Sequence, residues 1–315
     1  MTKNPSSGPA KPEQLWAPNR KKSKQMELAV KILFGCFALV SVATTIGIVL
    51  VLIFETIEFF KEVPLWRFLT DTQWTPLFEN PKFGIFVLMS ATLLTSAIAV
   101  FVALPLGLLA AIYLSEYASP TLRKWLKPAL EILAGVPSVV YGYFALLFVT
   151  PMIQGILGDN LVRGFNALSA GLVLGISIIP LVTSLSEDAI FAVPRSLREG
   201  AYGLGATKRE TIVGVVLPAA LSGIVASFII AVSRAIGETM IVTIAAGQNP
   251  TLGLNPFVPI MTMTAYIVQA SLGDTPAGSL AYKTVFSVGM TLFLTTLVLN
   301  IFSFWFVRKF REKYD

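Results

Sequence analysis

The chain has 315 residues, of which 55% are hydrophobic and only 13% are charged, and its formal net charge is +6. This composition excludes a soluble globular protein and is typical of a polytopic membrane protein. Histidine is absent and Cys36 is the only cysteine, which excludes an intrachain disulfide, a Cys/His metal site and a histidine base. We therefore expect no catalytic residue and no metal or other cofactor bound by this chain.

The chain begins with a polar, proline-containing stretch, which predicts a disordered cytoplasmic N-terminal tail over residues 1–31. Long apolar stretches follow, and they predict an all-α membrane protein with six transmembrane helices. We place these helices at about 32–54, 83–114, 128–152, 165–186, 219–247 and 284–307. The transmembrane domain then covers residues 32–307, and residues 308–315 form a cytoplasmic C-terminal tail.

Lysine and arginine are distributed unevenly between the two sides that these six helices create. The termini and the loops on their side hold eighteen of the 24 Lys and Arg residues, the opposite loops hold five, and Arg234 lies within the fifth helix. The positive-inside rule then places both termini in the cytoplasm. The net positive charge accordingly points to the anionic headgroups of a lipid bilayer and not to nucleic acid.

A few polar residues lie in or near the second and third helices. Thr92 and Thr95 are candidates for a polar path, although hydroxyls here most often bond back to their own helix and serve packing. Glu131 lies near the cytoplasmic end of the third helix and is a candidate for gating or for lining a path; the alternative is that it snorkels to the interface. Pro137 removes a backbone donor and predicts a kink where a gate can bend.

The cytoplasmic loop 187–218 is the most informative polar segment of the chain. Pro194 is well placed to begin a short helix, and Gly205 to end it. Thr207, followed three residues later by Glu210, has the pattern of a capping box that begins a second helix. The loop is therefore predicted to form a cytoplasmic knob of two short helices with a sharp bend between them.

The spacing of residues in this loop resembles the EAA loop of ABC importer permeases. The matching residues are Glu199, Gly200, Ala201, Gly205, Leu217 and Pro218. The resemblance implies a coupling helix, which sits in a groove of a separate cytoplasmic ATPase and passes its movements to the membrane subunit. Gly200 departs from the alanine that is usual there, at a cost in helix propensity of roughly 1 kcal/mol. The alternative is an ordinary amphipathic loop that fits the spacing by chance.

Arg234 and Glu238 lie deep in the fifth apolar stretch, where an isolated charge costs roughly 2.5 to 3.5 kcal/mol. Four residues apart on one helix, they would share a face and pair with each other. Gly237 would let another backbone or a substrate approach closely. Arg234 is thus a candidate for binding an oxyanion on a path across the membrane, with Glu238 orienting it or relaying a gating change. A purely structural ion pair is the alternative.

Three segments together resemble the Pst-type phosphate permeases, and specifically their C subunit. The segments are AGVPSVVYGY at 134–143, LREGAYGLGATKRETIVGVVLP at 197–218 and SRAIGET at 233–239. The resemblance covers about residues 83–307, and it implies the type I ABC importer (MetI-like) architecture with the helix at 32–54 peripheral to that core. It also implies a multi-pass protein of the bacterial plasma (inner) membrane, and Arg234 and Glu238 match family positions implicated in transport.

The same resemblance implies the partners and the activity. The partners would be a homologous permease A subunit, a dimer of ATPase subunits that binds ATP and Mg, and a periplasmic or extracellular phosphate-binding protein. The chain would then be a transport subunit and not an enzyme, and it would form half of a path that carries phosphate by alternating access.

Three other interpretations stay open on the residues alone. One Arg does not discriminate among tetrahedral oxyanions, so the substrate could be sulfate, molybdate or a phosphonate. An anion channel or secondary transporter without an ATPase is a second alternative, although such folds commonly show internal repeats and we find none here. In the third, the chain only anchors an active sibling subunit.

Overall fold

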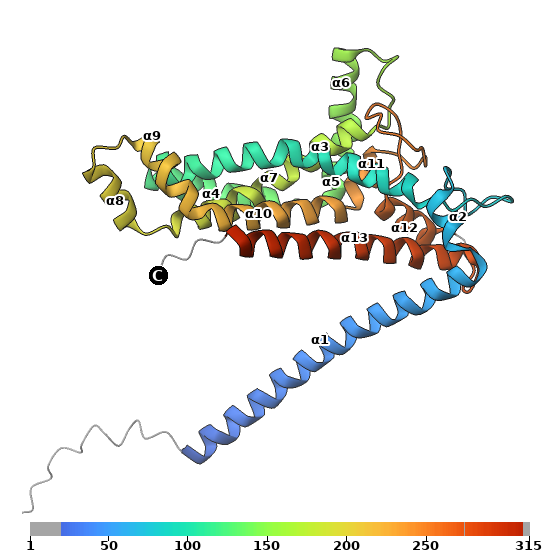
Figure 1. The fold of residues 1–315 in the computed structure, drawn as a ribbon, viewed down its shortest axis with the longest axis horizontal. Coiled ribbons are helices and arrows are strands. Elements are labelled where there is room, and N and C mark those ends of the chain that lie inside the picture. Colours follow the sequence, from blue (N-terminus) through green and yellow to red (C-terminus); the bar gives the residue numbers. More distant parts are fainter. Residues whose placement is uncertain (1–19, 274, 311–315) are drawn as a thin grey trace, which may run out of the picture. The chain divides into compact units, whose positions relative to one another are not determined.

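The computed structural model describes residues 20–273 and 275–310, and Figure 1 shows that this part is built almost wholly from helices. One isolated β-bridge joins Trp74 and Phe83. The helices are α1 (Arg20–Glu62), α2 (Leu65–Thr70), α3 (Ile85–Ile112), α4 (Pro120–Ala134), α5 (Ser138–Phe144), α6 (Thr150–Leu157), α7 (Ala167–Phe191), α8 (Arg195–Gly203), α9 (Lys208–Thr211), α10 (Leu217–Gly237), α11 (Met240–Ala245), α12 (Met263–Leu272) and α13 (Leu280–Phe310). This architecture confirms the predicted all-α fold class.

Three wide, π-helical turns adjoin these helices: η2 (Tyr113–Tyr117), η3 (Ala145–Val149) and η4 (Ile212–Val216). Two of them are followed by a proline near the start of the next helix, Pro151 in α6 and Pro218 in α10. Proline lacks an N–H and its ring clashes with the carbonyl four residues earlier, so the helix widens before it. The Thr150 hydroxyl donates to the Ala145 carbonyl, 3.0 Å away, and so satisfies an acceptor in η3.

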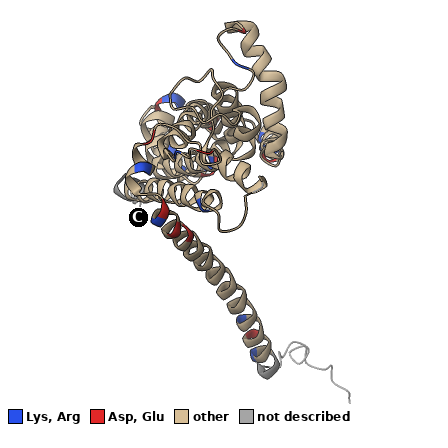
Figure 2. Cartoon of the chain, turned by 90° about the vertical axis from the view of Figure 1, so that its right-hand side faces the viewer, with Lys and Arg blue, Asp and Glu red and all other residues tan. Residues whose placement is uncertain are grey.

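The chain divides between Val51 and Leu52 into two units. In the first unit, the described residues all belong to α1, which begins at Arg20 and therefore inside the stretch predicted as a tail. Residues 20–31 consist almost wholly of good helix formers, namely Lys, Arg, Gln, Met, Glu, Leu and Ala, so the helix extends through them. Figure 2 shows charged positions near both ends of α1 and none along its middle, in agreement with the apolar stretch 32–54.

Six helical segments in the described residues are long and apolar enough to cross a membrane. They are Ser23–Glu62, Ile85–Tyr117, Ser138–Leu157, Ala167–Phe191, Lys208–Gly237 and Leu280–Trp305. Their number agrees with the sequence prediction, and four of them overlap closely with the predicted positions. The third and the fifth differ from the prediction in where the helix is interrupted.

The third predicted helix, 128–152, is wrong as a single element. Helix α4 ends at Ala134, residues 135–137 interrupt the helix, and α5 begins at Ser138. Pro137 has no N–H to continue α4, and it restricts the backbone of the preceding residue. The Tyr141 hydroxyl donates to the Leu133 carbonyl, 2.9 Å away, and so bridges the interruption.

The fifth predicted helix, 219–247, is displaced toward the N-terminus. It begins at Lys208 in the second helix of the predicted knob, runs through η4 and ends at Gly237. Residues that were predicted to continue it form the separate short helix α11. The helix 284–307 is also longer than predicted, since α13 continues to Phe310; the rest of the predicted tail, 311–315, lies outside the described residues.

The core of the second unit is the close packing of α3 against α7, with α10 and α11 alongside. Small residues make this approach possible: a Cβ on Gly175 would lie 2.8 Å from the Ala99 carbonyl oxygen, and one on Gly171 would lie 2.7 Å from the Ile98 Cβ. Helices in a bilayer associate by such close packing, since lipid tails are as apolar as leucine.

The two ends of this unit differ in construction. In Figure 1, α8 and α9 lie at one end of the long helices α3, α7 and α10, whereas α2, α11 and α12 lie toward the other. Helix α6 is directed away from the bundle, crosswise to α3 and α7. At the α2 end, Phe59, Phe68, Trp74, Phe83 and Tyr266 form a buried aromatic cluster with edge-to-face contacts. The α8 and α9 end carries the ion pairs described below.

Candidate functional site

The helix that carries Arg234 stops one turn later. Helix α10 ends at Gly237, and Glu238 has an extended backbone conformation with φ −66° and ψ 133°. The Glu238 carbonyl accepts a hydrogen bond of 2.8 Å from the Thr264 hydroxyl, which ties this break to α12. An interrupted helix within an apolar span leaves backbone groups that must be satisfied by neighbouring protein, water or a ligand.

Glu238 is bonded to the next helix and not to Arg234. Its Oε1 accepts from the backbone N–H groups of Met240 and Ile241, at 3.1 and 3.4 Å. These are orphan donors at the start of α11, where a negative charge is also favoured by the helix dipole. The predicted pairing of Glu238 with Arg234 required a continuous helix, and the break at Gly237 removes that geometry.

Arg234 lies on an exposed face of α10 in this chain taken alone, and so does Gly237. The Arg234 guanidinium forms no ion pair or hydrogen bond with any residue that the structure describes. A Cβ on Gly237 would meet nothing within 4 Å, so the surface beside Arg234 is open. A cation in an apolar span requires an anion, water or another chain beside it.

The other predicted path residues are not brought to this place. Thr92 and Thr95 are buried inside the fold, where each donates to a carbonyl of its own helix. The Thr92 hydroxyl also accepts from the Met263 N–H at 3.0 Å, so it joins α3 to the start of α12. This burial agrees with a role of the two threonines in packing, and it does not support a role in lining a path.

Glu131 and Pro137 lie on the exposed surface near α4. Glu131 lines a groove that faces the α8 and α9 end of the molecule, together with the cations of α4 and Arg195. Pro137 is the N-cap residue of α5, at the predicted break in the backbone. The structure thus associates Glu131 with the knob end and does not associate it with Arg234.

The predicted knob of two helices is present at residues 195–211 (Figure 1). Gly205 has φ +83°, a left-handed conformation that favours glycine, and it makes the bend after α8. The capping box is complete, because Thr207 Oγ1 accepts from the Glu210 N–H and the Glu210 carboxylate accepts from the Thr207 N–H. The sequence therefore correctly predicted both the bend and the start of the second helix, although that helix continues into α10.

The motif residues of the knob fall into two groups. Glu199, Gly200 and Gly205 are exposed, Ala201 is half-buried, and the neighbouring Leu204 leaves 91% of its surface accessible. Leu217 packs on a buried cluster that contains Val216, Ala220 and Ile224, and Pro218 lies in the first turn of α10. The first group offers a surface, whereas the second anchors the knob to the bundle.

Arg198, which the sequence analysis did not single out, holds α8 to the bundle. Its guanidinium donates to the carbonyls of Val193 and Ile190, at 2.5 and 2.9 Å, and to the Glu116 carboxylate at 3.0 Å. Glu116 belongs to η2, the wide turn that ends α3. The two side chains are largely buried, with 16% of Arg198 and 9% of Glu116 exposed.

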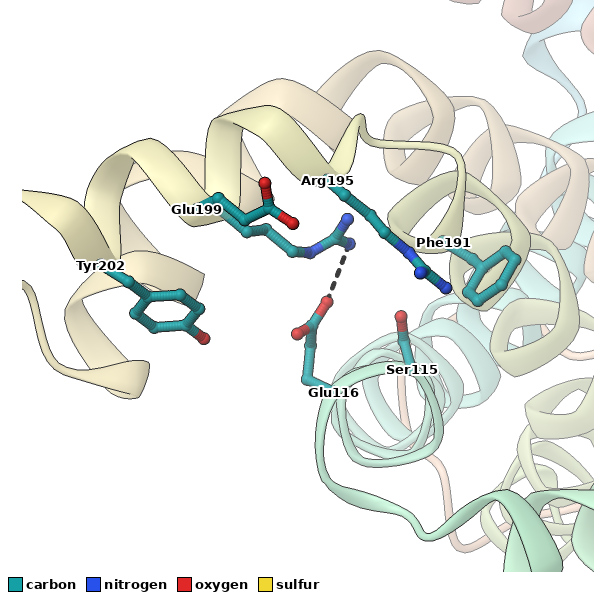
Figure 3. Close-up of a pocket in the computed structure, with 7 residues that line it drawn as sticks. Ser115, Glu116, Phe191, Arg195, Glu199 and Tyr202 are labelled. Atoms are coloured by element: carbon teal, nitrogen blue, oxygen red, sulfur yellow. Dashed lines mark hydrogen bonds and ion pairs between the residues drawn. The ribbon is translucent and has the colours of Figure 1, made fainter.

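Figure 3 shows this ion pair within a pocket of about 430 Å³ between η2 and α8. Glu116 points from η2 toward α8, and the dashed line marks its bond to Arg198. Arg195 extends toward Phe191, while Tyr202 and Glu199 lie at the other side. The Ser115 Oγ is buried and has no hydrogen-bond partner among the described residues.

A second group of charges joins α4 to α7. Glu187 is 1% exposed, and its carboxylate pairs with Arg123 and with Lys127, the latter at 2.8 Å. Lys127 also pairs with Asp188 at 2.8 Å, and these two carboxylates raise the pKa of the lysine, with Asp188 as the larger cause. Both halves of this group are visible in the sequence, as three cations in the loop 114–127 and an acidic pair at the end of the apolar helix 167–191. Their pairing was not predicted, because some sixty positions separate them.

A comparison with protein families decides the class of the chain. The model of a family described as "Binding-protein-dependent transport system inner membrane component" matches residues 103–314, which is more than half of the chain. The chain belongs to this family. The family match includes the knob, the break at Gly237 and Arg234.

Individual relatives of this inner membrane component agree. It is 32% identical over 283 residues to the "Probable ABC transporter permease protein YqgH" of Bacillus subtilis (strain 168), covering 89% of this chain and 88% of that protein. It is 35% identical over 261 residues to the "Phosphate transport system permease protein PstC" of Mesorhizobium japonicum, covering 77% and 79%. The PstC of Haemophilus influenzae is 34% identical over 262 residues, covering 78% and 82%. These likenesses confirm the resemblance predicted from the sequence.

Solved structures confirm the fold alone, because their identity to this inner membrane component is low. A bacterial alginate ABC transporter, solved in complex with its pentasaccharide-bound periplasmic protein, has a chain with a TM-score of 0.63 at 16% identity, covering 91% of this chain and 98% of that one. The MetNI methionine ABC transporter in an inward-facing conformation gives 0.52 at 18% identity, covering 73% and 95%. The predicted MetI-like architecture is thereby confirmed.

Proposed function

We propose that this chain is a permease subunit of an ATP-driven phosphate importer, and that it forms half of the translocation path. The observation that carries the proposal is Arg234, an intramembrane cation that no described residue of its own chain neutralises. A planar guanidinium offers parallel N–H donors to a tetrahedral oxyanion. The identity to phosphate permeases over about three quarters of the chain supports phosphate as that oxyanion.

In this proposal the break beside Arg234 lets the path change. Glu238 holds the start of α11 through two N–H bonds, and Gly237 joins it to α10 without a side chain that would obstruct the surface. A rotation of α10 relative to α11 about this joint would move Arg234 while Glu238 stays bonded to α11. Such a movement would contribute to alternating access, in which the anion site opens first to one side of the membrane and then to the other.

The partners follow from the two ends of the chain. The exposed surface of α8, with Glu199 and Leu204, is the surface that an ATPase dimer would contact, and that dimer would carry the ATP and Mg. A homologous second permease would complete the path beside Arg234, and a phosphate-binding protein would deliver the anion at the α2 end. If the knob is cytoplasmic, both termini would be cytoplasmic as well, because four spans precede α8 and two follow it.

The test is phosphate uptake by vesicles that contain this chain with its ATPase and its sibling permease. We expect ATP-dependent uptake of labelled phosphate that is lost when the ATPase is inactivated by substitution. Sulfate, molybdate and a phosphonate serve as competitors at equal concentration. Phosphate uptake that needs no ATP would overturn the importer assignment. Phosphate would be overturned as the substrate if another oxyanion inhibited the uptake of labelled phosphate more strongly than unlabelled phosphate does, or were itself taken up faster.

A further inference from the structure

Arg198 joins three parts of the molecule that are separate in the sequence. It belongs to α8, its first two acceptors are the Ile190 and Val193 carbonyls at the end of α7, and its third is Glu116 at the end of α3. The pair with Glu116 is largely shielded from water, which strengthens a charge-assisted bond relative to an exposed one. A side chain held by three acceptors cannot move without moving those acceptors or losing their bonds.

The turn that receives this contact is also held by the second helix of the knob. Lys208, the first residue of α9, places its Nζ 4.6 Å from the centre of the Tyr117 ring. Glu116 and Tyr117 are neighbours in η2, so α8 and α9 both contact the same turn. A π-helical turn has one residue more than a regular α-helical turn, and it commonly marks a functional position. The two contacts thus meet at the least regular part of α3.

We propose that Arg198 is a positioning residue that transmits displacement of the knob to α3 and α7 through Glu116 in η2. The inference rests on the proposed function, since it concerns how ATPase movements at α8 reach the path. Helices α3 and α7 are packed closely along their length, so a pull on their ends is shared by both. The residues that contact the ATPase and the residue that passes on its movement are therefore different, although Arg198 and Glu199 are adjacent.

The experiment measures ATP hydrolysed per phosphate transported, in proteoliposomes that hold the complete complex. Arg198→Gln removes the charge and three of the five N–H donors, and we expect the ratio to rise by about tenfold because transport falls while hydrolysis persists. Glu116→Gln removes only the ion pair and leaves the two carbonyl bonds in place, so the ratio should rise by a smaller factor. Arg198→Lys, which keeps the charge but not the planar fork, should lie between Arg198→Gln and the unmodified chain.

The control is Lys124→Gln on α4, outside the α8 surface proposed for the ATPase. Lys124 is exposed and its side chain forms no ion pair or hydrogen bond with any described residue, so its removal should leave the ratio unchanged. An unchanged ratio in both Arg198→Gln and Glu116→Gln would overturn the inference. If Arg198→Gln fails to assemble, Glu116→Gln decides alone. Absent phosphate uptake by the unmodified complex would instead overturn the proposed function.

Discussion

Two arginines of this chain, Arg198 at the knob and Arg234 in the membrane, are treated in opposite ways by the fold. Arg198 is largely buried and is satisfied by a carboxylate and two carbonyls of its own chain. Arg234 is exposed on an apolar span, and no residue in the described part of the chain bonds to it. The nearby Glu238 would be an available partner on a continuous helix, but it is used to cap α11.

The two arginines differ in whether their partners belong to this chain. At the knob end, the chain neutralises its buried charges with its own residues: Glu187 has two cations and Glu116 has Arg198. At the break in α10, the charge is left for something outside this chain to neutralise. A cation without a partner in an apolar span is a candidate position for contact with a ligand or a partner subunit, whereas the paired charges at the knob end serve the fold of the chain itself.

The largest effect that we expect is the loss of phosphate uptake when Arg234 is substituted. Arg234→Gln should lower phosphate uptake by about a hundredfold, since a charge-assisted contact to the anion is lost. The thermal unfolding of the purified complex should be nearly unchanged, because no internal bond is removed. Arg234→Lys should restore part of the uptake. Undiminished uptake in Arg234→Gln would contradict a role of Arg234 in binding the anion and would instead indicate a structural contact with the sibling subunit.

The converse is expected at Glu187, whose effect should be on stability. Glu187→Gln leaves Arg123 and Lys127 without their buried carboxylate and should lower the free energy of unfolding by about 2 kcal/mol. The neighbouring Asp188 is the matched control: its side chain is 60% exposed, so Asp188→Asn should cost less than about 1 kcal/mol. Thermal unfolding in detergent measures both variants. An equal loss of unfolding free energy in both variants would show that the burial of Glu187 adds nothing to the stability of its ion pairs.

A smaller pair of effects sharpens the description of the knob. Gly205→Ala places a Cβ on a backbone with φ +83° and should destabilise the bend by about 1 kcal/mol. Gly200→Ala adds a Cβ within α8 where nothing lies within 4 Å, so it should stabilise that helix by about 1 kcal/mol. Hydrogen exchange of the α8 amides should therefore be faster in the first variant and slower in the second. The same direction in both would contradict the assigned bend.

The smallest effect is a pH dependence at Lys127. Asp188 and Glu187 raise its pKa above the ordinary value of 10.5, so the folded state holds this proton more tightly than the unfolded state does. The resulting stability is fully present below pH 10.5 and is lost as the pH rises through the raised pKa. Unmodified chain and Lys127→Gln should thus differ in thermal stability at neutral pH and converge in strong alkali. Lys124→Gln, at a lysine that pairs with no described residue, should show no such convergence.

Much of the fold was predictable because its causes are local. The apolar stretches located six spans, the capping box of Thr207 and Glu210 located the start of α9, and Gly205 located the bend. The irregularity at Pro137 was also predicted, yet its consequence was not: the predicted helix 128–152 is interrupted there, and α4 lies outside the third membrane-crossing segment, Ser138–Leu157. Hydropathy does not distinguish an apolar helix from two apolar helices with a short break.

The sequence by itself determined the class of the protein, the number of its spans and the knob, and it named Arg234 as a candidate path residue, because periodicity, glycine, proline and intramembrane charge act over a few neighbouring residues. Only the tertiary structure decided which charges are paired. Glu238 bonds to α11 because α10 stops at Gly237, and Arg198 meets Glu116 across eighty-two positions because α3 and α7 end side by side. Such pairings depend on how distant segments pack, and a spacing rule along one helix contains no information about that.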